Sequence, residues 1–492
     1  MDALPIAIFW ALAAWATCSR RPALLYLFFA SMPFGSFAVV PTTVTGGLTL
    51  TPTPMVAVLL IARQLLNRQG LNYLANMALL PSGLLVLTLF WAAAIFATLF
   101  MPRLFAGAVN VVPMKITAFM QIARLQPTTQ NISQLVYVSI SVLAVFAFAR
   151  MLRQRAMRMH VMYALFLGGA LAVFTGLLDQ ASQYVQIQPL LAPFRTASYS
   201  LMTEVEILGG KRVVGLMPEA SAFGAVTLIF LVSLYFFRRA MPPGTLRDRA
   251  VPVLLALLLA MTWLSTSSAA YLGLGLFGLV AALEWASRAL LAGSNPYLRR
   301  GLLQELGIAA AGICLLVVAI AFNPAMFEPF MGMVDTMVFK KTGSSSFEER
   351  SMWTQVSWQA LLDTYGMGVG MGGTRASNFA VTLASNVGFV GAVLYCLFVL
   401  QSLLLRRVPA DDPQAGALKR AIFWSFLTPF VTSLLIGTSA DFGLSNAFLF
   451  GLGLAITQSD PARAPVAAPP TLATPARKAW MPASAREMPD GG

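Results

Sequence analysis

Charged residues that could act on a substrate gather in two stretches of an otherwise apolar chain. In the first, Lys211 and Arg212 come shortly before Glu219 in KRVVGLMPEASAFGAV. In the second, Arg350 and Arg375 flank SMWTQVSWQALLDTYGMGVGMGGT. A carboxylate can accept a proton or a hydrogen bond from a hydroxyl, and arginine makes paired hydrogen bonds to phosphate oxygens. These residue types predict chemistry that involves a hydroxyl and an anionic group.

Pro218 predicts the start of the helix that carries Glu219. Proline is favoured in the first turn of a helix, where its missing N–H costs nothing. About 20 residues run from Pro218 to Phe237, enough at about 1.5 Å each to cross a hydrocarbon core of about 30 Å. We therefore expect Glu219 in the first turn, at the outer membrane surface. The acid could stabilise the helix end or act on a substrate, and both interpretations stay open here.

The composition places most of the chain in a membrane. Of its 492 residues, 58% are hydrophobic and only 11% are charged, which is not the composition of a soluble domain. The net charge is +14, but most basic residues fall in short connectors, as the positive-inside bias produces without any nucleic acid. Three cysteines and one histidine predict neither a disulfide framework nor a metal site. That histidine, His160, follows a basic connector and is expected at the level of the lipid headgroups.

Apolar stretches recur along residues 1–457 and predict one all-α domain, a polytopic membrane protein with about 12 to 13 spanning helices. The expected spans are 3–18, 22–40, 53–66, 80–100, 131–149, 161–178, 216–237, 251–268, 270–286, 306–322, 377–405, 421–437 and 441–457. Four of these are short for a crossing of about 20 residues: 3–18, 53–66, 270–286 and 441–457. Residues 458–492 are rich in Pro, Ala and Thr, and are expected to form a disordered cytoplasmic tail.

Basic residues in the connectors predict the orientation. Two spans separate each basic connector from the next, so all of them are expected on the cytoplasmic side. Their basic residues are Arg150, Arg153, Arg155 and Arg158; Arg238, Arg239, Arg247 and Arg249; Arg288, Arg299 and Arg300; and Arg406, Arg407, Lys419 and Arg420. The two longest connectors, about 179–215 and about 323–376, then face the opposite side. Connectors of this length are usually functional when they are not disordered, so we expect them to build a site.

The outer connectors carry basic residues that the positive-inside bias does not explain. They are Arg195, Lys211, Arg212, Arg350 and Arg375. Arginine suits paired contacts with diphosphate, so an anionic ligand is favoured for the set. For any single arginine, a salt bridge to an acid such as Glu348 or Glu349 is the structural alternative.

Two further motifs have structural alternatives. The glycines of YGMGVGMGG have the spacing G-x-G-x-x-G from Gly368 to Gly373. No βαβ pattern surrounds them, so we reject a dinucleotide site and expect a tight turn or a close helix contact. The serines of WLSTSSAAYLGL, Ser267 among them, could line a cavity at the outer end of a span or allow close helix packing.

Three stretches together resemble the O-antigen polymerase and ligase superfamily, and the exopolysaccharide polymerases most. KRVVGLMPEASAFG resembles the Arg…Gly…Glu-Ala/Pro-Ser pattern at an outer helix start of these proteins, and LSTSSAAYLGL resembles their Thr-x-Ser span end. RSMWTQVSWQALLDTYGMGVGMGGTRASNFAVTLASNVGFVGAVLY resembles the segment that closes their second outer loop. The resemblance covers about residues 210–457, and the N-terminal half matches only in hydropathy.

The resemblance implies a membrane-embedded, GT-C-like glycosyltransferase at the periplasmic face of the bacterial inner membrane. A polymerase of this kind transfers a growing chain from undecaprenyl diphosphate to another lipid-linked repeat unit, without a metal or a cofactor. A ligase transfers the chain to the lipid A core instead. Ligases typically carry a histidine in the second outer loop, where this chain has Ser377-Asn378, which favours the polymerase. A transporter or flippase is the third hypothesis.

Roles for individual residues follow from this reading. Positive charge stabilises the diphosphate leaving group, and a carboxylate acts as a base or holds the acceptor hydroxyl. The expected catalytic residues are Glu219, Arg212 and Arg350, and the expected substrate-binding residues are Arg195, Lys211, Arg375, Asn378 and Ser267. The expected partners are the undecaprenyl-diphosphate-linked oligosaccharide and the bilayer, with a chain-length regulator or secretion proteins as further candidates, and no nucleic acid.

Overall fold

The computed structural model describes residues 3–41, 44, 49–114, 122–199, 201–203, 206–207, 210–291, 295–322 and 345–458. Within these ranges, six helices are long and apolar enough to cross a membrane. They are α5 (Leu85–Leu104), α6 (Thr129–Met151), α7 (Met157–Ala181), α9 (Ala220–Phe237), α11 (Ser268–Leu291) and α16 (Phe379–Leu400). The nearly all-α architecture of a polytopic membrane protein is confirmed, whereas the count of about 12 to 13 crossings stays a prediction.

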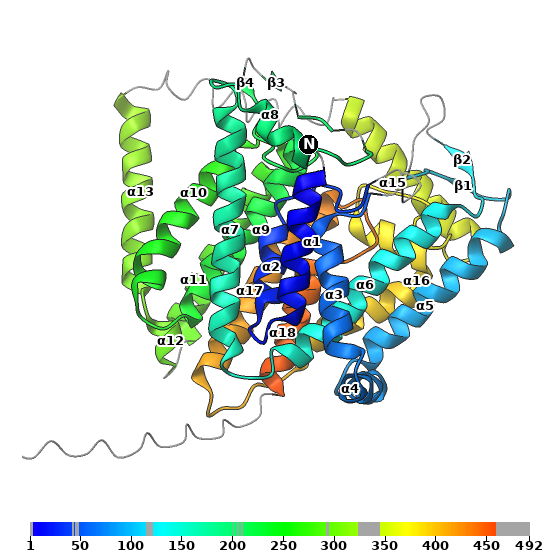
Figure 1. Cartoon of the computed structure of the whole chain (residues 1–492), viewed down its shortest axis with the longest axis horizontal. Coiled ribbons are helices and arrows are strands. Elements are labelled where there is room, and N and C mark those ends of the chain that lie inside the picture. The colour runs from blue at the N-terminus through cyan, green and yellow to red at the C-terminus, as the bar shows by residue number, and fades with distance from the viewer. Residues whose placement is uncertain are drawn as a thin grey trace, which may run out of the picture.

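Further helices lie alongside these six in one bundle (Figure 1). They are α1 (Ala3–Cys18), α2 (Ala23–Ser31), α3 (Pro52–Leu65), α10 (Val251–Leu264), α13 (Leu302–Phe322), α17 (Pro413–Ile436) and α18 (Leu444–Thr457). Short elements at the lower end are α4 (Arg68–Leu79), α12 (Pro296–Arg299), η2 (Arg238–Ala240), η3 (Leu246–Ala250) and η7 (Gln401–Leu405). Buried aliphatic and phenylalanine side chains from most of these helices form one continuous core.

The basic connectors meet at the lower end of the bundle in Figure 1. Arg158, at the start of α7, pairs with Asp412 just before α17, with 2.8 Å between nitrogen and oxygen. Arg239, directly after α9, pairs with Glu305 in the first turn of α13 at 3.1 Å. Asn295, just before α12, donates a hydrogen bond to the carbonyl of Pro413. The connectors therefore share one end, as their charge pattern predicts.

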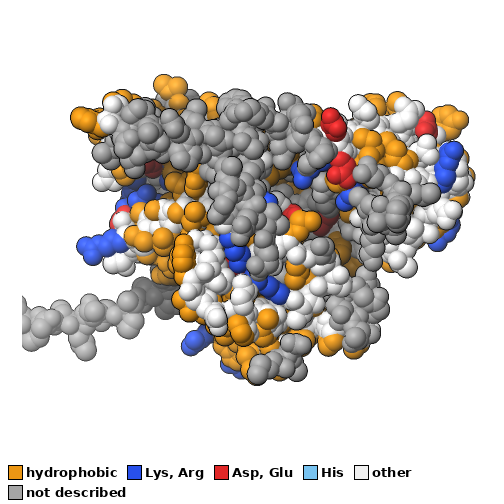
Figure 2. All heavy atoms as spheres, turned by 90° about the horizontal axis from the view of Figure 1, so that it is seen from above, with side chains coloured by type: hydrophobic (Ala, Val, Ile, Leu, Met, Phe, Trp, Pro, Cys, Tyr) orange, Lys and Arg blue, Asp and Glu red, His pale blue; other side chains and the backbone are white. Residues whose placement is uncertain are grey.

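The opposite, upper end carries the long connectors. Here β1 (Asn110–Val111) pairs with β2 (Ala123–Arg124), and β3 (Glu206–Ile207) pairs with β4 (Gly210–Lys211), both antiparallel. Helices α8 (Gln188–Leu191), η1 (Ala192–Phe194) and α15 (Ser345–Asp363) also belong to this end (Figure 1). Figure 2 views the molecule from above and shows acidic and basic side chains close together on this face. Residues 323–344 of the second connector and the tail 459–492 lie outside the described residues.

Two expected spans differ from the helices found. The apolar stretch 22–40 is helical only over α2, because proline and glycine interrupt it. Beyond α2 the backbone bonds to another connector, as where the amide of Ser36 donates to the carbonyl of Leu216 at 3.0 Å. Hydrogen-bond partners within the protein allow non-helical backbone at this depth, since lipid offers no hydrogen-bond partners. The stretch 270–286, expected to be short, is part of α11, a helix of 24 residues.

The glycine-rich segment before α16 is a packed structural element. Gly368 and Gly370 have φ angles of +80° and +81°, which other residues rarely adopt. The amide of Val369 donates to the carbonyl of Ser385 in α16 at 2.8 Å. A Cβ atom on Gly370 would lie 2.8 Å from the ring of Pro102 in α5. The predicted tight turn and close helix contact are therefore confirmed.

Gly388 is expected to be essential for stability. It lies inside α16 with φ +76° and ψ 171°, a region that only glycine occupies readily, and a Cβ there would lie 2.6 Å from the carbonyl oxygen of Met367. We expect Gly388→Ala to lower the unfolding temperature of the purified protein, since strain of this kind costs about 1–3 kcal/mol. Gly275→Ala in α11 is the control, because no described atom lies within 4 Å of its Cβ position. Equal unfolding temperatures for the two variants would contradict this prediction.

Candidate functional site

Glu219 precedes α9 instead of lying in its first turn. The helix begins at Ala220, and Glu219 is its N-cap residue, in an extended conformation with φ −155° and ψ 163°. Met202 pairs with Glu219 as in a β-bridge, and the amide of Met202 donates to the carbonyl of Pro218 at 2.8 Å. The prediction that Pro218 starts the helix is therefore wrong, because this pairing keeps Glu219 extended and the helix begins only at Ala220.

The carboxylate of Glu219 lies near enough to Arg212 for its charge to act on the guanidinium, and its side chain does not cap the helix. Its side chain makes no capping hydrogen bond to α9, and it accepts a hydrogen bond from the Ser221 hydroxyl. Burial lowers the pKa of the Arg212 guanidinium, and the negative charge of Glu219 opposes that shift. Both side chains are half-buried at the upper end of the bundle. The structure thus brings two of the expected catalytic residues together.

The turn between α10 and α11 lies beside Arg212. The Nε of Arg212 donates to the carbonyl of Ser265 at 3.4 Å, and Tyr271 is close enough to affect the pKa of Arg212. Thr266, in the same turn, has a φ angle of +44°, which is a strained conformation for a β-branched residue. Such strain persists only where surrounding contacts impose it, so this turn has a defined shape next to the arginine.

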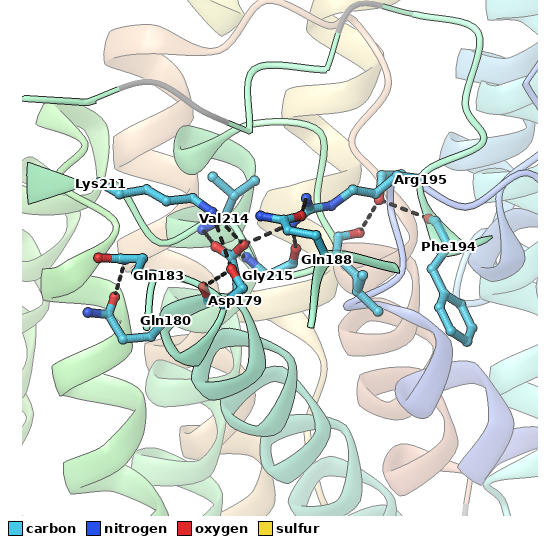
Figure 3. Close-up of polar contacts among 12 residues, drawn as sticks. Asp179, Gln180, Gln183, Gln188, Phe194, Arg195, Lys211, Val214 and Gly215 are labelled. Atoms are coloured by element: carbon cyan, nitrogen blue, oxygen red, sulfur yellow. Dashed lines mark hydrogen bonds and ion pairs between the residues drawn. The ribbon is translucent and has the colours of Figure 1, made fainter. Parts of the chain in front are cut away.

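Asp179, near the end of α7, holds the connector that leads into α9. Its side chain is fully buried. Its Oδ2 accepts hydrogen bonds from the amides of Val214 at 2.7 Å and Gly215 at 3.1 Å. Its Oδ1 lies 2.8 Å from Arg195 and 3.4 Å from Lys211 (Figure 3). The carboxylate of Asp179 therefore holds two cations and two backbone amides in place, and so fixes the connector between α7 and α9.

Arg195 and Lys211 are predicted above to bind substrate, and the structure pairs both with Asp179. Their side chains are only 9% and 10% exposed. This arrangement gives them a positioning role for the neighbouring Arg212, and their contact with substrate stays a prediction. Asp179 was not among the expected site residues, although an acid that ends the apolar run AVFTGLLD is a signal that could have identified it.

The second group of charged residues belongs to α15 and to the segment that precedes α16. The guanidinium carbon of Arg375 lies 3.7 Å from the centroid of the Trp353 ring, a favourable cation–π contact. Burial lowers the pKa of Arg375, Glu349 opposes the shift, and Arg350 adds to it. Arg350 and Arg375 therefore lie close together, with Glu349 as the acid that the sequence offers as a structural partner.

Asn378 and Ser267 have structural roles that account for their positions. Asn378 is the N-cap of α16, and its Oδ1 accepts a hydrogen bond from the amide of Val381 at 3.1 Å. Ser267, just before α11, is only 3% exposed. Close packing also explains a neighbouring serine, because a Cβ on Gly224 of α9 would lie 2.7 Å from the Ser265 hydroxyl. Substrate contact stays a prediction for Asn378 and Ser267.

Asp441 is an acid inside the bundle that the sequence pattern did not single out. It lies in the break between α17 and α18, where its carboxylate accepts hydrogen bonds from the Ser141 hydroxyl and the Gly443 amide, both at 3.1 Å. Ser141 is near the middle of α6, so Asp441 lies well below the upper end. The expected span 441–457 begins at Asp441, so the hydropathy pattern did not indicate the break between α17 and α18. The polar run GTSADFG is the signal that could have revealed it.

Comparisons with known proteins do not add a family to this geometry. No protein-family model matches the chain. No curated protein matches it either. Among the described residues, no group of three His, Cys, Asp or Glu side chains could hold a metal ion. The sequence motifs and the charged residues at the upper end are therefore the features that point to a function.

Proposed function

We propose that this protein is a membrane-embedded glycosyltransferase that joins lipid-diphosphate-linked oligosaccharide repeat units into a polysaccharide. The observation that carries the proposal is the Arg212–Glu219 pair, a cation beside a carboxylate at the end of the bundle opposite the basic connectors. By the positive-inside rule the basic end is cytoplasmic. The pair then faces the periplasm of a bacterial inner membrane, where the undecaprenyl-diphosphate-linked donor and acceptor are presented.

The proposed step is an attack on an activated sugar. A hydroxyl of the acceptor unit forms a bond to the anomeric carbon of the donor, the bond from that carbon to the diphosphate breaks, and the hydroxyl loses its proton. Glu219 accepts the hydrogen of the hydroxyl, as a base or as the group that orients it. Arg212 stabilises the negative charge that develops on the leaving diphosphate.

The surroundings of Arg212 support this role. Its guanidinium stays protonated at neutral pH even with a lowered pKa, because arginine loses its proton only at much higher pH. Partial burial strengthens its attraction for a diphosphate, since charges interact more strongly away from water. Asp179 holds the backbone at Val214 and Gly215, close along the chain, so the arginine sits on a fixed segment. Arg350 and Arg375 offer further positive charge at the same end of the bundle.

Reconstitution in vesicles with a lipid-linked repeat unit tests the proposal. We expect the purified protein to make a ladder of polymer lengths, and Glu219→Gln to lower kcat while KM for the acceptor changes little, because glutamine accepts a hydrogen bond but not a proton. Ser221→Ala, which removes only the hydroxyl donor to Glu219, is the control and should keep most of the activity. A rise in KM alone would show that Glu219 holds the sugar, and activity equal to wild type would remove it from the site.

A transporter is the second candidate, and Asp441 favours it. Transporters bind substrates where helices are interrupted near the middle of the membrane, and an acid at that depth marks such a site. The break between α17 and α18 carries Asp441, and α16 is kinked at Gly388. In the same vesicles, movement of the lipid-linked unit between leaflets without any new glycosidic bond would favour this function. Transfer of a whole chain to lipid A core would instead show a ligase.

A further inference from the structure

Two adjoining cavities lie at the lower end of the bundle, where α1, α2 and α3 run side by side (Figure 1). The larger, about 580 Å³, lies between α1, α2 and α7. The smaller, about 320 Å³, lies between the α1–α2 turn, α3 and the α6–α7 connector. Arg21 and Pro22 line both, so the cavities meet at the α1–α2 turn. Both volumes are in the range of small-molecule sites, about 300–1,000 Å³.

The smaller cavity is strongly basic. Its lining includes Arg20, Arg21, Arg63 and Arg150, and none of the described residues that line it is acidic. Two of the arginines also hold helix ends: Arg63 donates to the carbonyl of Ala16 at 3.0 Å, and Arg150 donates to the carbonyl of Gln64. Each guanidinium has five N–H donors, more than these bonds use. Arg20 and Arg21 are exposed.

Several arginines at this end pair with carboxylates, but no described carboxylate pairs with the four arginines of the smaller cavity. Arg158 lies 2.8 Å from Asp412, and Arg288 lies 2.8 Å from Glu284. The positive-inside bias explains why arginines collect at this end, but it does not explain why four of them line one cavity that has no described acid. Charge complementarity therefore indicates an anionic occupant that the protein itself does not supply.

The larger cavity continues from these arginines into apolar surroundings. Its walls include Leu12, Trp15 and Leu167. The side chain of Trp15 is 61% exposed, so this wall faces the surrounding lipid. Along α7 the cavity runs from His160 to Leu167, about 10 Å at about 1.5 Å per residue. An apolar channel that ends at a basic cavity has the polarity of a phospholipid, with an acyl chain above and a phosphate below.

A polar pair of side chains lies near the boundary between the basic cavity and the apolar cavity. The hydroxyl of Tyr26 and the Nδ1 of His160 are 2.9 Å apart, and both residues line the larger cavity. Tyr26 is in the first turn of α2 and His160 is in the first turn of α7, so both lie near the lower end. This is the headgroup level that the sequence predicts for His160, and it is the level of the ester groups of a bound lipid.

We propose that an anionic phospholipid of the phosphatidylglycerol type binds here, with its phosphate on Arg20 and Arg21 and one acyl chain in the cavity between α1, α2 and α7. The site lies at the end of the bundle opposite Arg212 and Glu219, so it does not depend on the proposed glycosyl transfer. Pockets of this kind between helices on the cytoplasmic side suit anionic headgroups.

Lipid titration of the full-length protein in a neutral detergent tests this proposal. We expect phosphatidylglycerol to raise the unfolding temperature and to remain bound in native mass spectra, whereas phosphatidylcholine and inorganic phosphate do neither. Arg20→Ala with Arg21→Ala should weaken phosphatidylglycerol binding by about 10- to 30-fold, from about 1 kcal/mol for each arginine near the surface. Leu167→Trp, which fills the apolar cavity and leaves every charge in place, should weaken it as well.

Arg299→Ala with Arg300→Ala is the matched control. It also removes two adjacent exposed arginines at the lower end, but outside both cavities, and it should leave binding unchanged. An equal loss in both double variants would overturn the proposal, since the attraction would then be a property of the whole basic face. Equal affinity for phosphatidylcholine, or preferred binding of a polyprenyl phosphate or of inorganic phosphate, would overturn it too.

Discussion

Arg212→Ala is expected to slow polymer formation from lipid-linked repeat units by about 10²–10³-fold, the usual effect of removing one group that stabilises transition-state charge. Arg212 is half-buried beside Glu219 and makes one long hydrogen bond, of 3.4 Å, to Ser265. Its loss should therefore remove charge from the site without unfolding the protein. The measurement is the initial rate of ladder formation in vesicles, with the unfolding temperature of each variant measured alongside.

Two further variants sharpen this test. Arg212→Lys should recover part of the activity, because lysine keeps the charge but cannot form the paired contact with phosphate oxygens. Arg124→Ala removes an exposed arginine in β2, also at the upper end, and should leave the rate unchanged. If Arg212→Ala and Arg124→Ala were equally active, the arginine would have no part in the reaction. A large drop in unfolding temperature for Arg212→Ala would show a structural role instead.

Asp179→Ala is expected to destabilise the protein by about 3–5 kcal/mol, as breaking a buried ion pair does. Without the carboxylate, Arg195 and Lys211 would be buried cations with no counter-charge from Asp179, and the amides of Val214 and Gly215 would lose their acceptor. The free energy of unfolding in detergent, together with the yield of folded protein, measures the effect. Asp179→Asn should fall between wild type and alanine, since the amide oxygen can still accept.

Asp248→Ala is the control for Asp179→Ala. Asp248 also pairs with an arginine, Arg247 at 2.7 Å, but its side chain is 44% exposed. Exposed ion pairs contribute about 0–1 kcal/mol, so we expect little change in stability. Similar stability for the Asp179→Ala and Asp248→Ala variants would mean that the contacts of Asp179 do not hold the connector.

Apolar length and connector charge were enough to predict most of the helices and the end at which the basic connectors meet. The expected span 377–405, for example, corresponds to α16 together with η7. The same signals could not predict that α2 stops at Ser31, because the chain beyond it depends on bonds to a connector far away in the sequence. Hydropathy reports whether a stretch suits lipid, and it carries no information about which distant backbone group satisfies it.

For the candidate site too, the sequence indicated some of the charged residues but not the partners that they contact in the fold. Residue type and sidedness singled out Arg212 and Glu219, which the structure places near enough for their charges to interact. Arg195 was singled out by the same reasoning, yet its partner is Asp179, an acid whose role depends on how the connector between α7 and α9 folds back onto the end of α7. Asp441 was missed because its contact with Ser141 joins residues far apart in the sequence. Charged residues in an outer loop are therefore candidates for substrate binding, and tertiary contacts decide which of them already pair with another residue of the protein.

The ion pairs of the lower end have a mechanical consequence for the whole bundle. Glu284 of α11 lies within 3.1 Å of Arg239, which follows α9, and Arg239 also pairs with Glu305 of α13. Separating these helices at the lower end would leave buried charges unpaired, at a cost of several kcal/mol. A widening of the upper end that keeps these ion pairs intact would therefore require α9, α11 and α13 to tilt about this charged anchor.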